Sequence, residues 1–157
     1  MEPVTKNEIL DAFEEDVGEL SLPDLNSINW EVLDYLGWVH PSGHVGYVLL
    51  VSPRDGNLRG TMLSRSRRHS KSLRYQMCSL CSHVHRMEET AMFTITVRGS
   101  DDRHHLGNVV CKNLDCSLRI RNLVEPNSYM NETLYIQAKV WRMQKAIHRW
   151  LDRANRL

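Results

Sequence analysis

Four cysteines in two close pairs are the residues of this sequence best suited to chemistry. Two residues separate Cys78 from Cys81 in MCSLCSHVH, and four separate Cys111 from Cys116 in VVCKNLDCSLRIRN. A tight knuckle directs two thiolates at one point, and a second pair at a helix start adds two more near the positive helix end. Four thiolates satisfy tetrahedral zinc and leave no open position. The pattern therefore predicts one structural zinc ion held by all four cysteines.

Other uses of the cysteines fit this sequence less well. A thioredoxin-type redox pair follows a strand and opens a helix inside a βαβ unit, whereas the first pair here follows a basic segment and the second pair would have no role. Disulfides are uncommon in the cytosol. We expect a cytoplasmic protein because the acidic, amphipathic N-terminus is neither a signal nor a transit peptide. An iron–sulfur cluster also takes four thiolates, but this spacing matches no specific cluster motif.

Histidines stand close to both cysteine pairs and are alternative metal ligands. They are His83, His85, His104 and His105. With four cysteines already paired, we expect these histidines at the surface or behind the ligands, where they orient them. A catalytic zinc would keep a water position and a nearby general base. The sequence also shows no nucleophile elbow, phosphate-binding glycine loop or spaced carboxylate pair. We therefore expect no enzyme and no small-molecule substrate.

The N-terminal segment has the pattern of an amphipathic helix. Thr5 and Glu8 fit a capping box, and Ile9, Phe13 and Val17 recur at helical spacing after it. We expect this apolar face to pack on the rest of the protein.

Charge is segregated along the chain. Residues 1–34 carry ten acidic residues and one lysine, whereas residues 35–157 carry 19 basic and nine acidic residues. The segregation has two interpretations. Either an acidic arm packs on a basic body, or a basic surface meets an acidic partner such as RNA or an acidic protein.

The middle of the chain changes to strand patterns. Three short apolar segments are separated by the turn-forming sequences HPSGH and SPRDGN, which predicts an antiparallel meander over residues 34–39, 46–51 and 58–63. The sequence also predicts a hairpin between the two cysteine pairs, from a strand-like segment at residues 91–97, the turn GSDDRHHLGN, and Val109 with Val110. No apolar run approaches the roughly 18 residues of a membrane span.

The final segment, residues 131–157, is predicted to be helical because its apolar residues step by four and three. Its other faces are basic. Together the elements favour an α+β fold, with a small antiparallel sheet, an N-terminal helix, a zinc finger and a long C-terminal helix.

At the cysteine motifs the sequence resembles the treble-clef zinc finger of elongation factor G-binding proteins, the FBP and FusB-type family. The motifs CSLCSHVH and VVCKNLDCSLRIRN carry this resemblance, and LDYLGWVHPSGHVGYVLLV resembles the α/β portion that precedes the finger in compact FBP-type relatives. The resemblance covers about Trp30 to the C-terminus. It implies a cysteine-only zinc site and a non-enzymatic protein that docks on elongation factor G. FusB-type proteins carry an additional N-terminal helical domain, where this sequence offers one acidic helix.

We therefore predict two parts of one compact unit. Residues 1–76 hold the N-terminal helix, the meander and a basic linker, and residues 77–157 hold the treble-clef finger and the C-terminal helix. The predicted function is a zinc-binding adaptor of the translation machinery, bound to elongation factor G or the ribosome. The alternative is an RNA-binding zinc-finger protein, which the basic linker and the basic final helix suggest.

The surface offered to the partner is predicted next to the second cysteine pair. Leu118, Arg119, Ile120 and Arg121 form a run too short to bury every apolar group and both charges. We therefore expect Arg119 and Arg121 to face outward and, with Lys112, to form part of the partner-binding patch.

Overall fold

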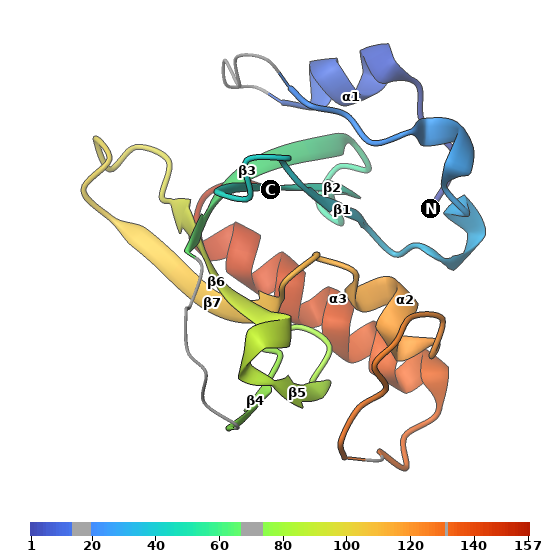
Figure 1. The fold of residues 1–157 in the computed structure, drawn as a ribbon. Helices are drawn as coiled ribbons and strands as arrows, with labels where there is room; N and C mark the ends of the chain where they lie inside the picture. Colours follow the sequence, from blue (N-terminus) through green and yellow to red (C-terminus); the bar gives the residue numbers. More distant parts are fainter. Residues whose placement is uncertain (14–19, 67–73, 131) are drawn as a thin grey trace.

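The computed structural model describes residues 1–13, 20–66, 74–130 and 132–157 (Figure 1). In this part of the chain a five-stranded antiparallel sheet has the order β1-β2-β3-β6-β7. Its strands are β1 (Leu36–Val39), β2 (Val45–Val51), β3 (Leu58–Ser66), β6 (Thr90–Thr96) and β7 (His105–Cys111). A separate two-stranded hairpin pairs β4 (Tyr75–Met77) with β5 (Val84–Arg86). The helices are α1 (Lys6–Ala12), α2 (Cys116–Ile120) and α3 (Ile136–Arg153), with short 3-10 turns at Leu25–Ser27, Trp30–Val32 and Met87–Glu89.

The predicted meander is confirmed as β1, β2 and β3, and the predicted hairpin as β6 and β7. Strand β2 is buried on both faces: Tyr47 and Leu49 pack toward the N-terminal segment, and Val48 and Leu50 pack toward the cysteines and α3. The sheet is thus the middle layer, with α1 over one face and the finger and α3 over the other (Figure 1). Such a strand must be apolar along its whole length, as GYVLLV is.

Helix α1 begins at the predicted capping box, in which the Thr5 hydroxyl accepts the Glu8 N–H and the Glu8 carboxylate accepts the Thr5 N–H. Ile9 and Phe13 are buried, as the helical spacing predicted, while Val17 lies outside the described residues. The Phe13 ring lies directly on the backbone of β3, where a Cβ at Gly60 would stand 2.4 Å from Phe13 Cδ2. It also meets Trp38 edge to face, with centroids 6.1 Å apart.

Helix α3 covers the opposite face with Met143, Ile147, Trp150 and Leu151. The helix begins at Ile136, later than the predicted residue 131, and Ile136 itself is 44% exposed. Its register on the sheet is set near the other end, where the Trp150 indole N–H donates to the Leu106 carbonyl over 3.3 Å. No helix within the described ranges is both long enough and apolar enough to cross a membrane.

Strands from both predicted parts share the central sheet. Ser64 of β3 pairs with Thr94 of β6, and one core cluster contains side chains from before and after residue 77. The division into residues 1–76 and 77–157 stays a prediction.

The packing of α1 on the sheet can be tested by truncating the Phe13 side chain. We expect Phe13→Ala to lower the free energy of unfolding by about 3 kcal/mol, because the ring contacts β3 and two aromatic side chains and would leave a cavity. Leu10→Ala on the exposed side of the same helix should cost less than about 0.5 kcal/mol. Urea unfolding of both variants measures the difference in their free energies of unfolding. Equally small losses of stability would show that α1 does not pack on the sheet.

Candidate metal centre

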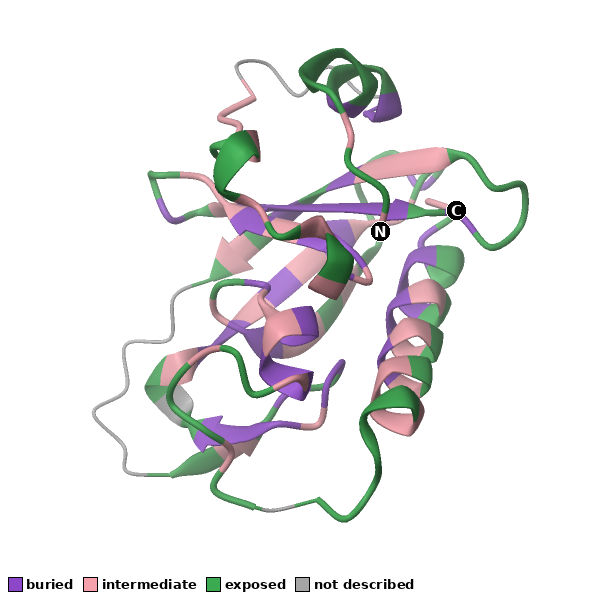
Figure 2. Ribbon diagram, turned by 90° about the vertical axis from the view of Figure 1, so that its right-hand side faces the viewer, coloured by how far each residue is buried: buried purple, intermediate pink, exposed green. Residues whose placement is uncertain are grey.

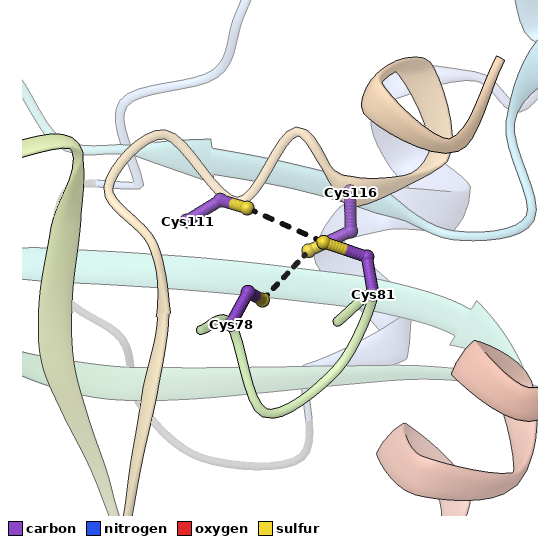
Figure 3. Close-up of side chains that lie close together, drawn as sticks. All are labelled: Cys78, Cys81, Cys111 and Cys116. Carbon is purple, nitrogen blue, oxygen red and sulfur yellow. Dashed lines mark hydrogen bonds between the residues drawn. The ribbon is translucent and has the colours of Figure 1, made fainter. Parts of the chain in front are cut away.

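Four sulfur atoms from the two cysteine pairs point toward one another (Figure 3). Cys78 and Cys81 lie on the turn that joins β4 to β5, Cys111 is the last residue of β7, and Cys116 is the first residue of α2. Cys78 Sγ lies 3.7 Å from Cys116 Sγ, and Cys81 Sγ lies 3.5 Å from Cys111 Sγ. All four sulfurs lie within 4.8 Å of one another, and all four residues are buried.

This geometry fits a single tetrahedral zinc ion. With Zn–S bonds of about 2.3 Å, tetrahedral thiolates stand about 3.8 Å apart, close to the two shortest separations here. The same separations are far above the roughly 2.05 Å of a disulfide bond, and all four cysteines are free thiols. A cluster of several iron atoms would also hold its cysteines farther apart. The predicted site for one structural zinc ion is thus present, built by Cys78, Cys81, Cys111 and Cys116.

The local backbone explains why these spacings bring the sulfurs together. In the first knuckle the Cys78 N–H donates to the His83 carbonyl and the Ser82 N–H donates to the Cys78 carbonyl. Ser82 adopts a φ of 61°, which closes the turn in the left-handed region. Between Cys111 and Cys116 the chain reverses direction at Leu114. This residue has a φ of 59°, and its N–H donates to the Cys111 carbonyl.

Ionisation of all four cysteines together requires a cation. Hydrogen bonding with the other cysteines, led by Cys116, raises the pKa of the Cys111 thiol well above its usual value, and burial adds to this. Neighbouring thiolates repel one another, so four of them ionise together only when a positive ion balances them. Zinc supplies that charge when bound, and the chain supplies the dry, closed cage.

A histidine lies directly behind one ligand. His85 is fully buried and its Nε2 is 3.3 Å from Cys111 Sγ, a position from which it can donate a hydrogen bond to a thiolate. Burial, followed by the nearby Arg119 cation, lowers the pKa of His85 to about 4, so the ring is neutral at pH 7. Neither His85 nor the adjacent His83 belongs to the four-ligand cluster. His85 therefore lies behind a ligand, one of the two positions expected for the histidines. His83 is buried beside it, with the ring centroids 5.0 Å apart, and His104 and His105 are exposed.

A tyrosine that sequence reasoning missed lies near Cys116. Tyr35 is 2% exposed and packs in the same core as Cys116, and its hydroxyl oxygen is buried with no hydrogen-bond partner in the described part of the chain. Burial, followed by the charge of Cys116, raises the pKa of Tyr35 well above its usual value, so the hydroxyl keeps its proton. An unpartnered buried donor beside the sulfurs suits a site whose ligands are anionic when loaded.

The predicted outward orientation of Arg119 is wrong. Its side chain is 2% exposed, and its Nε donates to Asp115 Oδ1 over 2.8 Å while Nη1 donates to the Pro126 carbonyl. A neighbouring acid one helical turn away lets α2 bury this charge, because the pair and its hydrogen bonds offset the desolvation cost.

The other two residues of the predicted patch also form ion pairs. Arg121 makes a two-pronged contact with Asp34, with N–O distances of 2.7 and 3.1 Å, and its side chain is only 19% exposed. Lys112 contacts Glu89 at 2.7 Å. A partner-binding role for Lys112 and Arg121 stays a prediction, whereas Arg119 is a buried link between α2 and the following loop.

Metal dependence is tested most directly at Cys111. We expect Cys111→Ser to lose zinc and most of the stability of the finger, because metal-binding free energy is largely folding free energy in a small zinc site. His105→Ser, at an exposed position of the same strand, should keep one zinc per chain and an unchanged melting temperature. Native mass spectrometry and melting with and without chelator measure both properties. A Cys111→Ser protein that retains zinc and its melting temperature would contradict the assignment.

The role of His85 is separable from that of a ligand. We expect His85→Ala to keep one zinc per chain but to bind it about 10- to 100-fold more weakly, because the hydrogen bond to Cys111 is lost. His85→Gln, whose amide can donate from a similar position, should restore part of the zinc affinity. His104→Ala should leave the zinc affinity unchanged. Competition with a fluorescent chelator provides the readout. A His85→Ala protein purified without metal would instead make His85 a ligand.

Comparisons with known proteins agree with this geometry. The family model of the FBP C-terminal treble-clef zinc-finger matches residues 6–154, whereas no curated protein sequence matches the chain. The solved structure of the fusidic acid resistance protein FusC is similar in fold, with a TM-score of 0.61 and 14% identity. That match covers 98% of this chain and 59% of FusC. The resemblance seen in the cysteine motifs is confirmed: the chain belongs to the FBP C-terminal treble-clef zinc-finger family.

Proposed function

We propose that this protein is a non-enzymatic adaptor that docks on elongation factor G, in the cytoplasm, through the exposed side of its zinc finger. Membership of the FBP family and the fold shared with a fusidic acid resistance protein support this proposal. The resemblance of the cysteine motifs to those of elongation factor G-binding proteins suggests the partner. The observation that carries the proposal is an aromatic surface beside the knuckle.

We call this surface the finger patch. It consists of Tyr75, Met77, Arg86, Tyr129 and Met130. The Tyr75 and Tyr129 rings lie 4.6 Å apart although both are about half exposed, at 58% and 47%. Arg86 Cζ lies 5.9 Å from the Tyr129 centroid. Large aromatic side chains, methionine and arginine are the residues enriched in protein interfaces, and tyrosine and arginine commonly carry most of the binding energy.

The zinc site holds the finger patch in shape. Tyr75 and Met77 lie on β4, which leads directly into Cys78, and Arg86 ends the paired strand β5. Tyr129 is attached to the same hairpin because its N–H donates to the Val84 carbonyl and the Val84 N–H donates to Ser128 Oγ. An isolated two-stranded hairpin is marginal in water. Metal binding at the adjacent knuckle therefore makes the patch rigid before a partner arrives, which lowers the entropic cost of binding.

A docking role also suits the closed metal site. Four cysteines complete the tetrahedron, so the site offers no position for a substrate or an activated water molecule. Zinc in such a site organises a surface and takes no part in a reaction.

The proposal is tested with purified elongation factor G and the zinc-loaded protein. We expect Tyr75→Ala with Tyr129→Ala to weaken binding at least tenfold, because both rings would be buried by the partner. Tyr135→Ala is the matched control, since Tyr135 is 69% exposed and lies outside the finger patch. Calorimetry on the three proteins gives the affinities.

The outcomes separate the partner from the surface. Absence of binding by the unchanged protein would refute elongation factor G as the partner. Binding that survives the double tyrosine change but not Tyr135→Ala would move the interface to the start of α3.

A further inference from the structure

Helix α3 presents a ridge that the metal centre and the finger patch do not use. Every fourth residue from Gln137 to Arg153 is exposed, and the members of this ridge are Gln137, Trp141, Lys145, Arg149 and Arg153. Residues four apart are about 6 Å apart along the axis and turned by about 40° round it, so they form a ridge inclined to the helix axis. The buried side chains of α3 face the sheet, and the exposed side of the helix faces away from the protein (Figure 2).

Trp141 is the unusual member of this ridge. Its side chain is 63% exposed, whereas Trp38 and Trp150 are 7% and 5% exposed. The only ring contact described for it is the Lys145 ammonium, 4.8 Å from the ring centroid. A large ring left in water on a helix surface, with a cation beside it, is ready to stack on a planar partner.

The ridge is also positive and unneutralised. No acidic side chain within the described residues pairs with Lys145, Arg149 or Arg153. The one acid of the helix, Asp152, is paired with Arg54. The basic residues on the neighbouring side differ from the ridge, because Lys139 and Arg142 both face Glu132. Three cations and an open indole therefore lie along one inclined ridge.

We infer that this ridge, formed by Trp141, Lys145, Arg149 and Arg153, binds single-stranded RNA. An unpaired base stacks on the Trp141 ring, and successive phosphates lie along the three cations. Single-stranded binding surfaces combine these two features, a basic track for the backbone and an aromatic face for the bases. The binding is independent of docking on elongation factor G, because it uses no residue of the finger patch.

Other anionic partners match the ridge less well. A duplex keeps its bases stacked inside, so it would leave the indole without a partner. An anionic membrane binds helices with a continuous apolar face on the exposed side, whereas this ridge has one aromatic residue among polar ones. An acidic polypeptide would neutralise the cations but supplies no row of planar rings.

The experiment uses the zinc-loaded full chain and a fluorescently labelled 12-nucleotide uridine oligomer, with fluorescence anisotropy across a salt series. With about three phosphates neutralised, the logarithm of affinity should fall with the logarithm of salt with a slope of about −2. Trp141→Ala should weaken binding about tenfold with an unchanged slope, because stacking is lost and charge is not. Lys145→Glu with Arg149→Glu should remove binding or flatten the slope.

The matched control reverses the same number of charges elsewhere. Lys6→Glu with Arg103→Glu changes two exposed cations outside α3 and should alter the affinity less than threefold. Circular dichroism and zinc content check that all variants are folded.

Three results would overturn the inference. The first is an equal loss of RNA affinity in the control and in the α3 double variant, which would show that RNA is attracted by charge without a specific site. The second is equal binding of Trp141→Ala and the unchanged protein, which would show that no base stacks on the ring. The third is tighter binding to polyglutamate, or to vesicles containing anionic lipid, than to the oligonucleotide, which would assign the ridge to that partner instead.

Discussion

Convergence of four buried sulfurs is the constraint on which the rest of the finger depends. The site joins the end of β7, the turn between β4 and β5 and the start of α2, three segments that lie apart in the sequence. The two-stranded hairpin and the five-residue α2 are both too short to be stable alone in water. Closing the four ligands on one ion adds to the hydrophobic contacts of these short elements and fixes them to one another.

The sheet supports the site by allowing a close approach of backbone to backbone. At Gly37 in β1 a Cβ would stand 2.5 Å from the carbonyl oxygen of Leu114, the residue that turns the chain between the second pair of cysteines. Gly46 in β2 similarly leaves room for the Phe93 ring, which a Cβ would meet at 2.5 Å. The glycine in LGW therefore lets the meander lie directly against the metal loop. Tyr35, two residues before Gly37, reaches the cysteines for the same reason.

How much of this structure could be predicted depends on the range over which each contact acts. The zinc ligands, the capping box and the α3 core face are local patterns, and their spacing alone indicated them. The burial of Arg119 also had a local signal, because Asp115 precedes it by one helical turn. The pairing of Arg121 with Asp34 had no such signal, since the two are 87 positions apart in the sequence and only the fold brings them together. The finger patch was missed for the same reason: Tyr75 and Tyr129 lie far apart in sequence and meet only across β5.

The two exposed surfaces depend on the metal to different degrees. The finger patch is carried by β4, β5 and the loop bonded to β5, all of which are attached to the body next to the ligands. Helix α3 is joined to the knuckle by a hydrogen bond in which Arg142 Nη2 donates to the Cys81 carbonyl over 3.2 Å. Two hydrogen bonds fix its C-terminal half to the β6–β7 hairpin. The Trp150 indole N–H donates to the Leu106 carbonyl, and the Arg98 N–H donates to the Ala154 carbonyl. Zinc therefore controls the order of the finger patch, while the cations of the α3 ridge rest mainly on the hydrophobic core beneath the helix.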